Sequence, residues 1–126
     1  MPADRSPIAG IDHVQITIPV GAEAAARAFY CALLGLPEIP KPDSLQGRGG
    51  FWVLVGDLPL HIGTEPVWDR SLTKAHIAFV VTDVDAWRHT VTASGYIVIE
   101  SIPIPGRDRF ETHDPFGNRL EFISRN

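Results

Sequence analysis

The chain has 126 residues, of which 44% are hydrophobic and 21% charged, and this composition predicts one ordinary globular domain over residues 1–126. The formal net charge of -4, with no basic cluster longer than residues 107–109, argues against a nucleic-acid partner. No apolar run approaches the roughly 20 residues that a membrane-spanning helix needs, so we expect no membrane partner and a cytoplasmic location. The single cysteine, Cys31, cannot form an internal disulfide, which fits a reducing compartment.

Residue alternation and helical spacing predict the first two elements. Residues 11–18 alternate with branched side chains and predict a strand, which Pro19 ends. Residues 23–34 carry alanines and a stripe of large apolar side chains at helical spacing. Gly35 follows where a left-handed cap is needed, so we expect the helix to end there.

The rest of the first half predicts a loop followed by a hairpin. Segment 37–50 is rich in proline, glycine and polar residues. It predicts a loop that contains one short strand around Glu38–Ile39 and that forms a mobile cover for a site. Residues 51–55 and 58–63 predict two strands joined by a short turn at residues 56–57.

The second half repeats this layout after a polar connection over residues 64–74. Asp83 can cap a helix that Gly95 ends. The turn Asp-Pro-Phe-Gly-Asn at residues 114–118 leads into the last strand. Strands are predicted at residues 75–81, 97–102, 107–112 and 119–123. The predicted order is therefore β-α-β-β-β twice.

Four side chains in short apolar runs occupy equivalent places in this internal repeat. His13 and His76 lie 63 positions apart near the start of each half, and His61 and Glu121 lie 60 positions apart near the end. Three imidazoles and one carboxylate brought together form a site for a divalent metal, and iron(II), manganese, cobalt, nickel and zinc all suit such ligands. A lone strand histidine is more often a core or edge residue, so this prediction depends on the repeat.

Three sequence motifs are similar to those of one protein family. They are Asp-His-Val at residues 12–14, Ala-His-Ile-Ala-Phe at 75–79 and Asp-Pro-Phe-Gly-Asn-Arg-Leu-Glu-Phe at 114–122. Together they resemble the vicinal oxygen chelate superfamily, which includes glyoxalase I, fosfomycin-resistance enzymes, bleomycin-binding proteins and extradiol dioxygenases. The resemblance covers residues 8–124, and its closing motif is specific for the superfamily but not for any one activity.

The resemblance implies an α+β, glyoxalase-like fold. Two βαβββ modules in tandem, residues 8–65 and 74–124, are expected to form a cup-shaped mixed sheet around a metal ion. Members of this family act on small molecules, so a small-molecule substrate is implied. Single-domain members commonly dimerise, which implies a homodimer with sites shared between the chains.

The resemblance also implies a ligand for each of the four positions. His13 matches the ligand on the first strand, His76 the ligand that opens the second module, and Glu121 the carboxylate on the last strand. His61 falls where glyoxalase I has a glutamate ligand, whereas fosfomycin-resistance enzymes and single-metal dioxygenases use only the other three positions. Glyoxalase I uses its carboxylate ligands for proton transfer, so Glu121 is also a predicted catalytic residue.

Strand parity suggests further site residues. Arg109 and Glu111 share one face of their strand, and in the resemblance this face points into the cup, with Glu111 as a candidate base and Arg109 as a holder of anionic groups. Gln15 lies two residues after the first histidine and Trp52 could form an apolar wall, so both are predicted to bind substrate. In the alternative interpretation, Arg109 and Glu111 pair with each other or across strands as a solvated face, and Arg119 is an ordinary edge charge.

Three function classes follow. The first is a metal-dependent glyoxalase-like enzyme that acts on a small oxygenated metabolite or antibiotic by metal-assisted proton transfer, as a lyase, isomerase or transferase. The second is an iron(II) ring-cleaving extradiol-type dioxygenase, and the third is a non-catalytic protein that binds a drug or metabolite. Gln15 replaces the threonine of fosfomycin-resistance enzymes, and residues 103–106 replace their basic, serine-rich loop, so phosphonate chemistry is disfavoured. His61 weakens the match to glutathione-dependent glyoxalase I.

Overall fold

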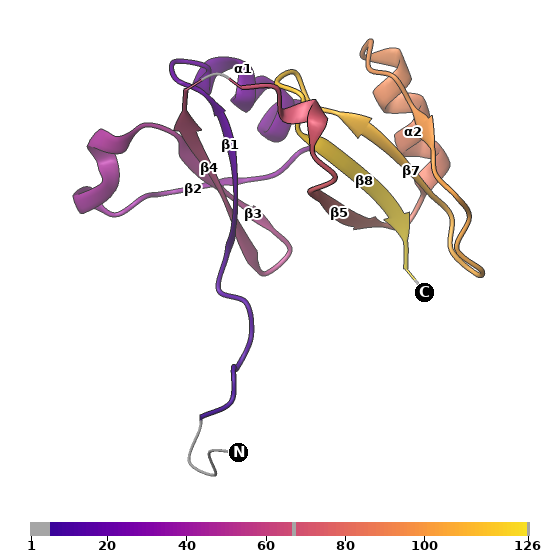
Figure 1. The fold of residues 1–126 in the computed structure, drawn as a ribbon, viewed down its shortest axis with the longest axis horizontal. Helices are drawn as coiled ribbons and strands as arrows, with labels where there is room; N and C mark the ends of the chain where they lie inside the picture. Colours follow the sequence, from indigo (N-terminus) through magenta and orange to yellow (C-terminus); the bar gives the residue numbers. More distant parts are fainter. Residues whose placement is uncertain (1–5, 67, 126) are drawn as a thin grey trace. The chain divides into compact units, whose positions relative to one another are not determined.

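The computed structural model describes residues 6–66 and 68–125, and the chain divides into two compact units (Figure 1). Unit 1 is Met1–Glu65 and unit 2 is Pro66–Asn126. Each unit contains one four-stranded mixed sheet and one main helix, so the predicted α+β class and the β-α-β-β-β order are confirmed. Among the described residues, no helix has the length and hydropathy to cross a lipid bilayer.

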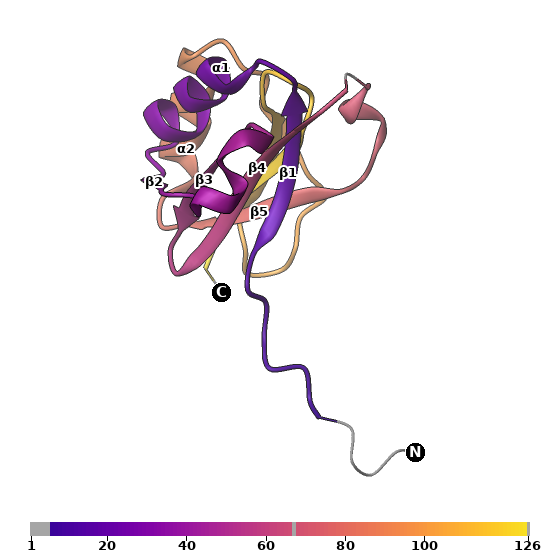
Figure 2. The ribbon, with the colours of Figure 1, turned by 90° about the vertical axis from the view of Figure 1, so that its left-hand side faces the viewer.

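Unit 1 has the sheet order β1-β4-β3-β2, in which β1 and β4 run parallel and the other neighbours run antiparallel (Figure 2). Its elements are β1 (Val14–Pro19), α1 (Glu23–Arg27), a π-helix (Ala28–Leu33), β2 (Glu38–Ile39), a 3₁₀ helix (Asp43–Arg48), β3 (Phe51–Val55) and β4 (Leu58–Glu65). The predicted turn between β3 and β4 is present, with Gly56 at φ 57°. A positive φ is the conformation that a tight hairpin requires and that glycine adopts without strain.

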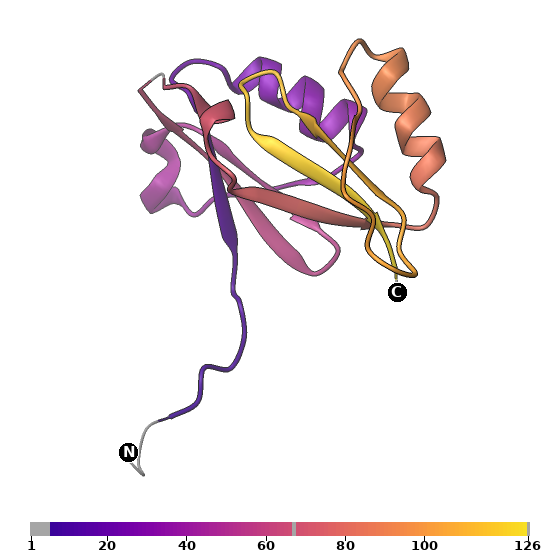
Figure 3. The same cartoon turned by 45° about the vertical axis from the view of Figure 1, so that its right-hand side comes forward.

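Unit 2 has the matching order β5-β8-β7-β6, again with one parallel pair, β5 and β8 (Figure 3). Its elements are a 3₁₀ helix (Arg70–Leu72), β5 (His76–Val81), α2 (Val84–Ala93), β6 (Ile99–Glu100), β7 (Arg109–His113) and β8 (Arg119–Ser124). Two predicted signals are confirmed here. Asp83 caps α2 by accepting a hydrogen bond from the backbone N–H of Ala86, and Asp114 organises the turn before β8 by accepting from the backbone N–H groups of Phe116 and Asn118.

Strand alternation gives each sheet one buried and one open face. In unit 1 the side chains of Phe51, Val53, Leu60 and Ile62 are at most 2% exposed. In unit 2 the equivalent layer is Phe79, Phe110, Leu120 and Phe122, and Trp87 of α2 stacks on Phe122. Because successive strand residues point to opposite faces, burial of these residues sends their neighbours to the other face, where the candidate sites lie.

Three predicted elements differ from the observed ones. The first strand begins at Val14, so His13 precedes it. The predicted helix 23–34 changes from α to π geometry, in which the N–H of Leu34 donates a hydrogen bond to the carbonyl of Phe29. A π-helical turn shifts the backbone bonds by one residue, which spacing alone does not signal. The predicted strand 97–102 shrinks to Ile99–Glu100, because the nearby prolines 103 and 105 lack the N–H that a ladder needs.

Candidate functional site

The open face of unit 2 carries a compact group of a histidine and two carboxylates. Glu111 on β7 stands opposite Glu121 on β8, and His76 at the start of β5 stands opposite Arg119 on β8. One ligand atom each from His76, Glu111 and Glu121 can be chosen so that all three lie within 4.8 Å of one another. Both carboxylates are buried, which is costly without cationic or hydrogen-bonding partners.

His76 is oriented by two contacts. Its Nδ1 lies 2.9 Å from the carbonyl oxygen of Lys74, and its Nε2 lies 3.0 Å from Oε1 of Glu121. A backbone carbonyl only accepts hydrogen bonds, so Nδ1 carries a proton and donates it there. This is the arrangement in which metal-binding histidines are usually held, because it directs Nε2 toward the ion.

Two arginines neutralise the carboxylates across the strands. Arg119 donates two hydrogen bonds to Glu111, at 2.9 and 2.7 Å, and this bidentate pair holds the pKa of Glu111 below its ordinary value. Arg109 donates to Oε2 of Glu121 at 3.3 Å and also to the carbonyl of Ile102. The arginines therefore pair across strands, but both carboxylates are buried, so this is not the solvated face of the alternative interpretation. The contact with Arg119 favours the ionised form of Glu111, and the site roles of Arg109 and Glu111 stay predictions.

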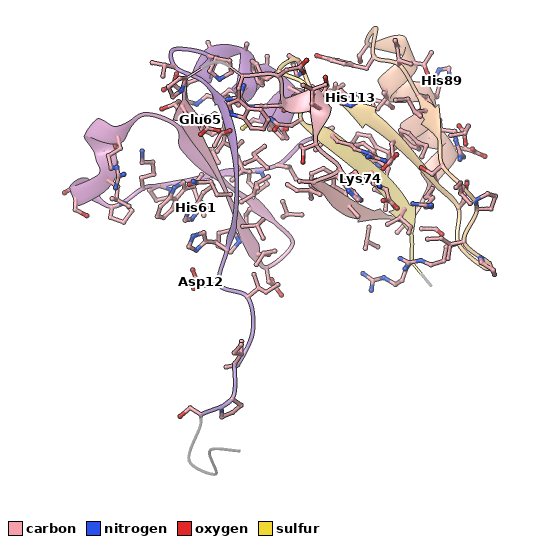
Figure 4. All side chains as sticks on the ribbon, in the orientation of Figure 1. Asp12, His61, Glu65, Lys74, His89 and His113 are labelled. Carbon is pink, nitrogen blue, oxygen red and sulfur yellow. The ribbon has the colours of Figure 1, made fainter. Side chains whose placement is uncertain are left out.

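The open face of unit 1 carries a stack of three rings instead. The imidazole of His61, which projects from β4 (Figure 4), lies between the indole of Trp52 and the imidazole of His13. The ring centroids are 3.7 Å apart for Trp52 and His61, with an interplanar angle of 2°, and 3.9 Å apart for His61 and His13, with an angle of 16°. Burial lowers the pKa of His61, and the neighbouring His13 adds to this effect. His61 is therefore a neutral, buried ring.

The stack bears on which histidines could bind one ion. A histidine coordinates a metal through a nitrogen lone pair that lies in the plane of its ring. The nearly parallel rings of His13 and His61 direct their in-plane lone pairs along separate planes, so in this arrangement both cannot point at a single ion. His13 is the more accessible of the two, with 44% of its side chain exposed, and its Nδ1 lies 2.8 Å from Oδ2 of Asp12. Joint binding of one metal by His13, His61, His76 and Glu121 stays a prediction.

A cavity of about 630 Å³ adjoins the stack within unit 1. Gln15 and Trp52, the two predicted substrate-binding residues of this unit, both line it. Lys41 and Arg48, from the segment between β2 and β3, line it as well. The structure thus places Gln15 and Trp52 at a cavity, whereas Arg109 stands beside the carboxylates of unit 2.

Sequence reasoning missed three charged residues at these two sites. Arg119, expected to be an edge charge, is the bidentate partner of Glu111, and Lys41 and Arg48 were not singled out at all. Arg119 lies two residues before Glu121, so strand parity could have placed it on the same face. Lys41 lies before the 3₁₀ helix Asp43–Arg48 and Arg48 lies at its end, within a segment that the sequence predicted as a loop, so residue spacing carried no such signal.

Comparison with known proteins gives a family that covers most of the chain. The family profile described as Glyoxalase/Bleomycin resistance protein/Dioxygenase superfamily matches residues 10–122. A glyoxalase-family protein from Bacillus anthracis has a similar structure with a TM-score of 0.87 and 43% sequence identity, over 97% of this chain and 99% of that chain. A search of curated proteins gave no match.

More distant structures share the fold. The fosfomycin resistance protein FosX from Listeria monocytogenes, solved with Mn(II) and 1S,2S-dihydroxypropylphosphonic acid, has a TM-score of 0.78 and 21% identity, over 95% of each chain. The FosX protein from Mesorhizobium loti has a TM-score of 0.68 and 19% identity, over 92% of this chain and 91% of that chain. The chain therefore belongs to the glyoxalase/bleomycin resistance protein/dioxygenase superfamily, and the predicted family is confirmed.

Proposed function

We propose that this member of the superfamily is a divalent-metal-dependent enzyme of the glyoxalase-like kind, which transfers a proton on a small oxygenated molecule. The observation that supports it most is the group of His76, Glu111 and Glu121, whose ligand atoms lie within 4.8 Å of one another on the open face of unit 2. The contact between His76 and Glu121 also favours binding of a cation by this group. His76 Nε2 and Glu121 Oε1 are 3.0 Å apart, and two acceptors at that distance need a proton or another cation between them.

The donor set fits a first-row divalent ion. One imidazole and two carboxylates suit manganese, iron(II), cobalt, nickel and zinc. In the proposal His76 and Glu121 hold the ion, Glu111 is a third ligand, and His13 is a further one as the resemblance implies. A bound metal supplies polarisation of substrate oxygens, which lowers the cost of negative charge developing on them.

Side chains of unit 2 are proposed to transfer the proton and to bind the substrate. Glu121 is the proposed proton carrier, because its Oε1 faces His76 while its Oε2 accepts from Arg109. Glu111 is less suited to that role, since the bidentate contact with Arg119 favours its ionised form. Arg109, half-buried beside Glu121, can hold an anionic oxygen of the substrate.

Metal analysis tests this proposal directly. The protein is loaded in turn with Mn(II), Fe(II), Co(II), Ni(II) and Zn(II), dialysed, and its metal content measured. We expect one ion per chain in the unchanged protein and loss of that ion in His76→Ala and Glu121→Gln. His89→Ala is the matched control, because His89 lies exposed on α2 (Figure 4) and should keep full metal content. A protein that retains none of the five ions contradicts the proposal.

The proposed homodimer with shared sites has its own test. His13→Ala and Glu121→Gln each remove a ligand from a different half of the site. If each site combines halves of two chains, a mixed dimer of the two variants keeps one intact site, so an unfolded and refolded equimolar mixture should regain about a quarter of the metal by random pairing. If each site lies within one chain, the mixture regains none.

The ring-cleaving iron(II) dioxygenase is a second candidate, and the ring stack beside the unit 1 cavity favours it because aromatic walls suit aromatic substrates. Protein loaded anaerobically with Fe(II) is mixed with catechols, and oxygen uptake is followed. Stoichiometric uptake with ring cleavage supports the dioxygenase. Bound metal without oxygen uptake supports proton-transfer chemistry, and tight ligand binding by a protein that holds no metal supports the non-catalytic class.

A further inference from the structure

The cavity of unit 1 has the size and lining of a small-molecule site in its own right. Its volume of about 630 Å³ falls within the range of roughly 300–1,000 Å³ that is typical of ligand pockets. The wall includes the aromatic rings of Trp52 and His61 and the apolar side chains of Ile39 and Leu45. All of these residues belong to unit 1.

The cavity is positively charged within a chain of net charge -4. It is lined by two cations, Lys41 and Arg48, and by one carboxylate, Asp12, which is in contact with His13. Across residues 6–66 and 68–125, neither cation forms an ion pair with a carboxylate. Two cations thus remain available to a ligand.

Hydrogen bonds connect the segment that carries the cations to helix α1 and within itself, and its role as a mobile cover stays a prediction. Gly50 donates its N–H to Oε2 of Glu23 at 3.0 Å, and Lys41 Nζ donates to the carbonyl of Gly49 at 2.7 Å. Gly49 and Gly50 both have φ near +75°, and a Cβ on Gly50 would lie 2.1 Å from the carbonyl oxygen of Ile62. Glycine therefore allows the segment to approach β4 closely, and Lys41 and Arg48 of this segment line the cavity.

We propose that this cavity binds a small aromatic carboxylate. The ring stack and the apolar side chains would contact the aromatic body, and Arg48, assisted by Lys41, would hold the carboxylate, since a guanidinium matches a carboxylate with two parallel hydrogen bonds. The inference rests on the proposed function in treating this ligand as the substrate class. Binding in the cavity uses side chains of unit 1 and needs no metal.

Calorimetry in the presence of a chelator tests the proposal with three probes. 1-Naphthoate has both the ring and the charge, 1-naphthol has the ring alone, and cyclohexanecarboxylate has the charge alone. We expect 1-naphthoate to bind at least about tenfold more tightly than either of the others, and its Kd to rise with salt. Equal affinity for naphthoate and naphthol, or no binding of naphthoate, overturns the proposal.

Matched variants locate the binding. Arg48→Gln should raise the Kd of naphthoate about tenfold and leave that of naphthol unchanged, whereas Arg125→Gln removes the same charge from exposed chain in unit 2 and should change neither. Trp52→Leu should weaken both aromatic probes, and Trp52→Phe should restore most of the loss. An Arg48→Gln protein that binds naphthoate normally contradicts the assignment. All probes are measured without metal, so the proposed binding of an aromatic carboxylate and the proposed metal site can each be contradicted without the other.

Discussion

The two sheets place different chemistry on the same framework. By strand register, Gln15 and Trp52 flank His61 in unit 1, and Ala78 and Glu111 flank Glu121 in unit 2 in the same way. His61 is thus equivalent to Glu121, and Trp52 to Glu111. In unit 1 these positions form a neutral stack of rings, and in unit 2 they form a group of charges neutralised by arginines.

This difference shows what a repeated fold determines and what it leaves to individual residues. The framework decides where a side chain stands on the open face, because register and parity are the same in both units. It does not decide whether that side chain binds a cation or an aromatic ring. Apart from His13, which lines the cavity and is also a proposed metal ligand, the residues of the proposed metal group and of the proposed aromatic-carboxylate cavity are separable by substitutions in one unit at a time.

The largest effect on stability is expected at Gly50 of unit 1. In Gly50→Ala the new Cβ meets the backbone oxygen of Ile62 at 2.1 Å, at a positive φ that disfavours any side chain. We expect a loss of about 4 kcal/mol in the free energy of unfolding, from strain and overpacking together. Gly95→Ala in unit 2 is the control, because it has φ +90° with nothing within 4 Å, and it should cost only about 1 kcal/mol. Urea unfolding of metal-free protein measures both, and equal losses would contradict the close approach.

The second largest loss of stability is expected in unit 2, when the arginine partner of a buried carboxylate is removed. Arg119→Ala leaves the buried carboxylate of Glu111 without its bidentate partner, and we expect a loss of about 2 kcal/mol, less than for a fully buried pair because a third of the arginine is exposed. Replacing Glu111 by leucine in the same protein should recover most of the loss. Urea unfolding of the single and double variants measures this coupling, and additive losses would show that the two residues stabilise the fold independently.

The sequence predicted best those features that depend on neighbouring residues. Asp83 before a helical stripe, glycine at a two-residue turn and the turn at 114–118 each act within a few positions, and all appear as expected. Chain-wide similarity identified the family. The π-helix was not foreseen, because apolar spacing does not distinguish π from α geometry. The short β6 was not foreseen, because the prolines at 103 and 105 lie beyond the predicted strand 97–102.

The candidate sites also contain features that the sequence predicted and features that only the structure revealed. Strand parity correctly placed Arg109 and Glu111 on one face. Their partners are diagonal neighbours on β8: the register places Glu111 opposite Glu121 and Arg119 opposite His113, so the contact between Glu111 and Arg119 became visible only with the structure. Trp52 and His61 are paired in the β3–β4 hairpin, whereas His13, which precedes β1, is distant from both in the chain. No local pattern distinguishes such stacked rings from metal ligands.

The helices of the two units provide a smaller contrast. Asp83 caps α2 with a hydrogen bond to the N–H of Ala86, whereas Ala22 precedes α1 with no side-chain cap. Asp83→Ala should cost about 1 kcal/mol of unfolding free energy. Ala22→Asp should gain less than about 0.5 kcal/mol, because the backbone there, at φ -94° and ψ 14°, is not extended as a capping residue requires. Thermal unfolding of both variants measures these changes. If Ala22→Asp gains as much stability as Asp83→Ala loses, the backbone at residue 22 readily adopts the capping conformation.

A pH-dependent effect, no larger than the loss of the Asp83 cap, concerns the carboxylate of Glu23, which accepts a hydrogen bond from the segment of unit 1. The N–H of Gly50 lowers the pKa of Glu23 in the folded protein, so the ionised form is preferred there more than in the unfolded chain. This contribution is complete above the pKa of an unfolded glutamate and is lost as the pH falls through the lower pKa of the folded protein. Glu23→Gln should therefore be less stable than the unchanged protein at pH 7, by about 1 kcal/mol, and the gap should close in acid. Urea midpoints measured from neutral to acidic pH test the sign, and a gap that widens in acid would contradict the anchoring role of Glu23.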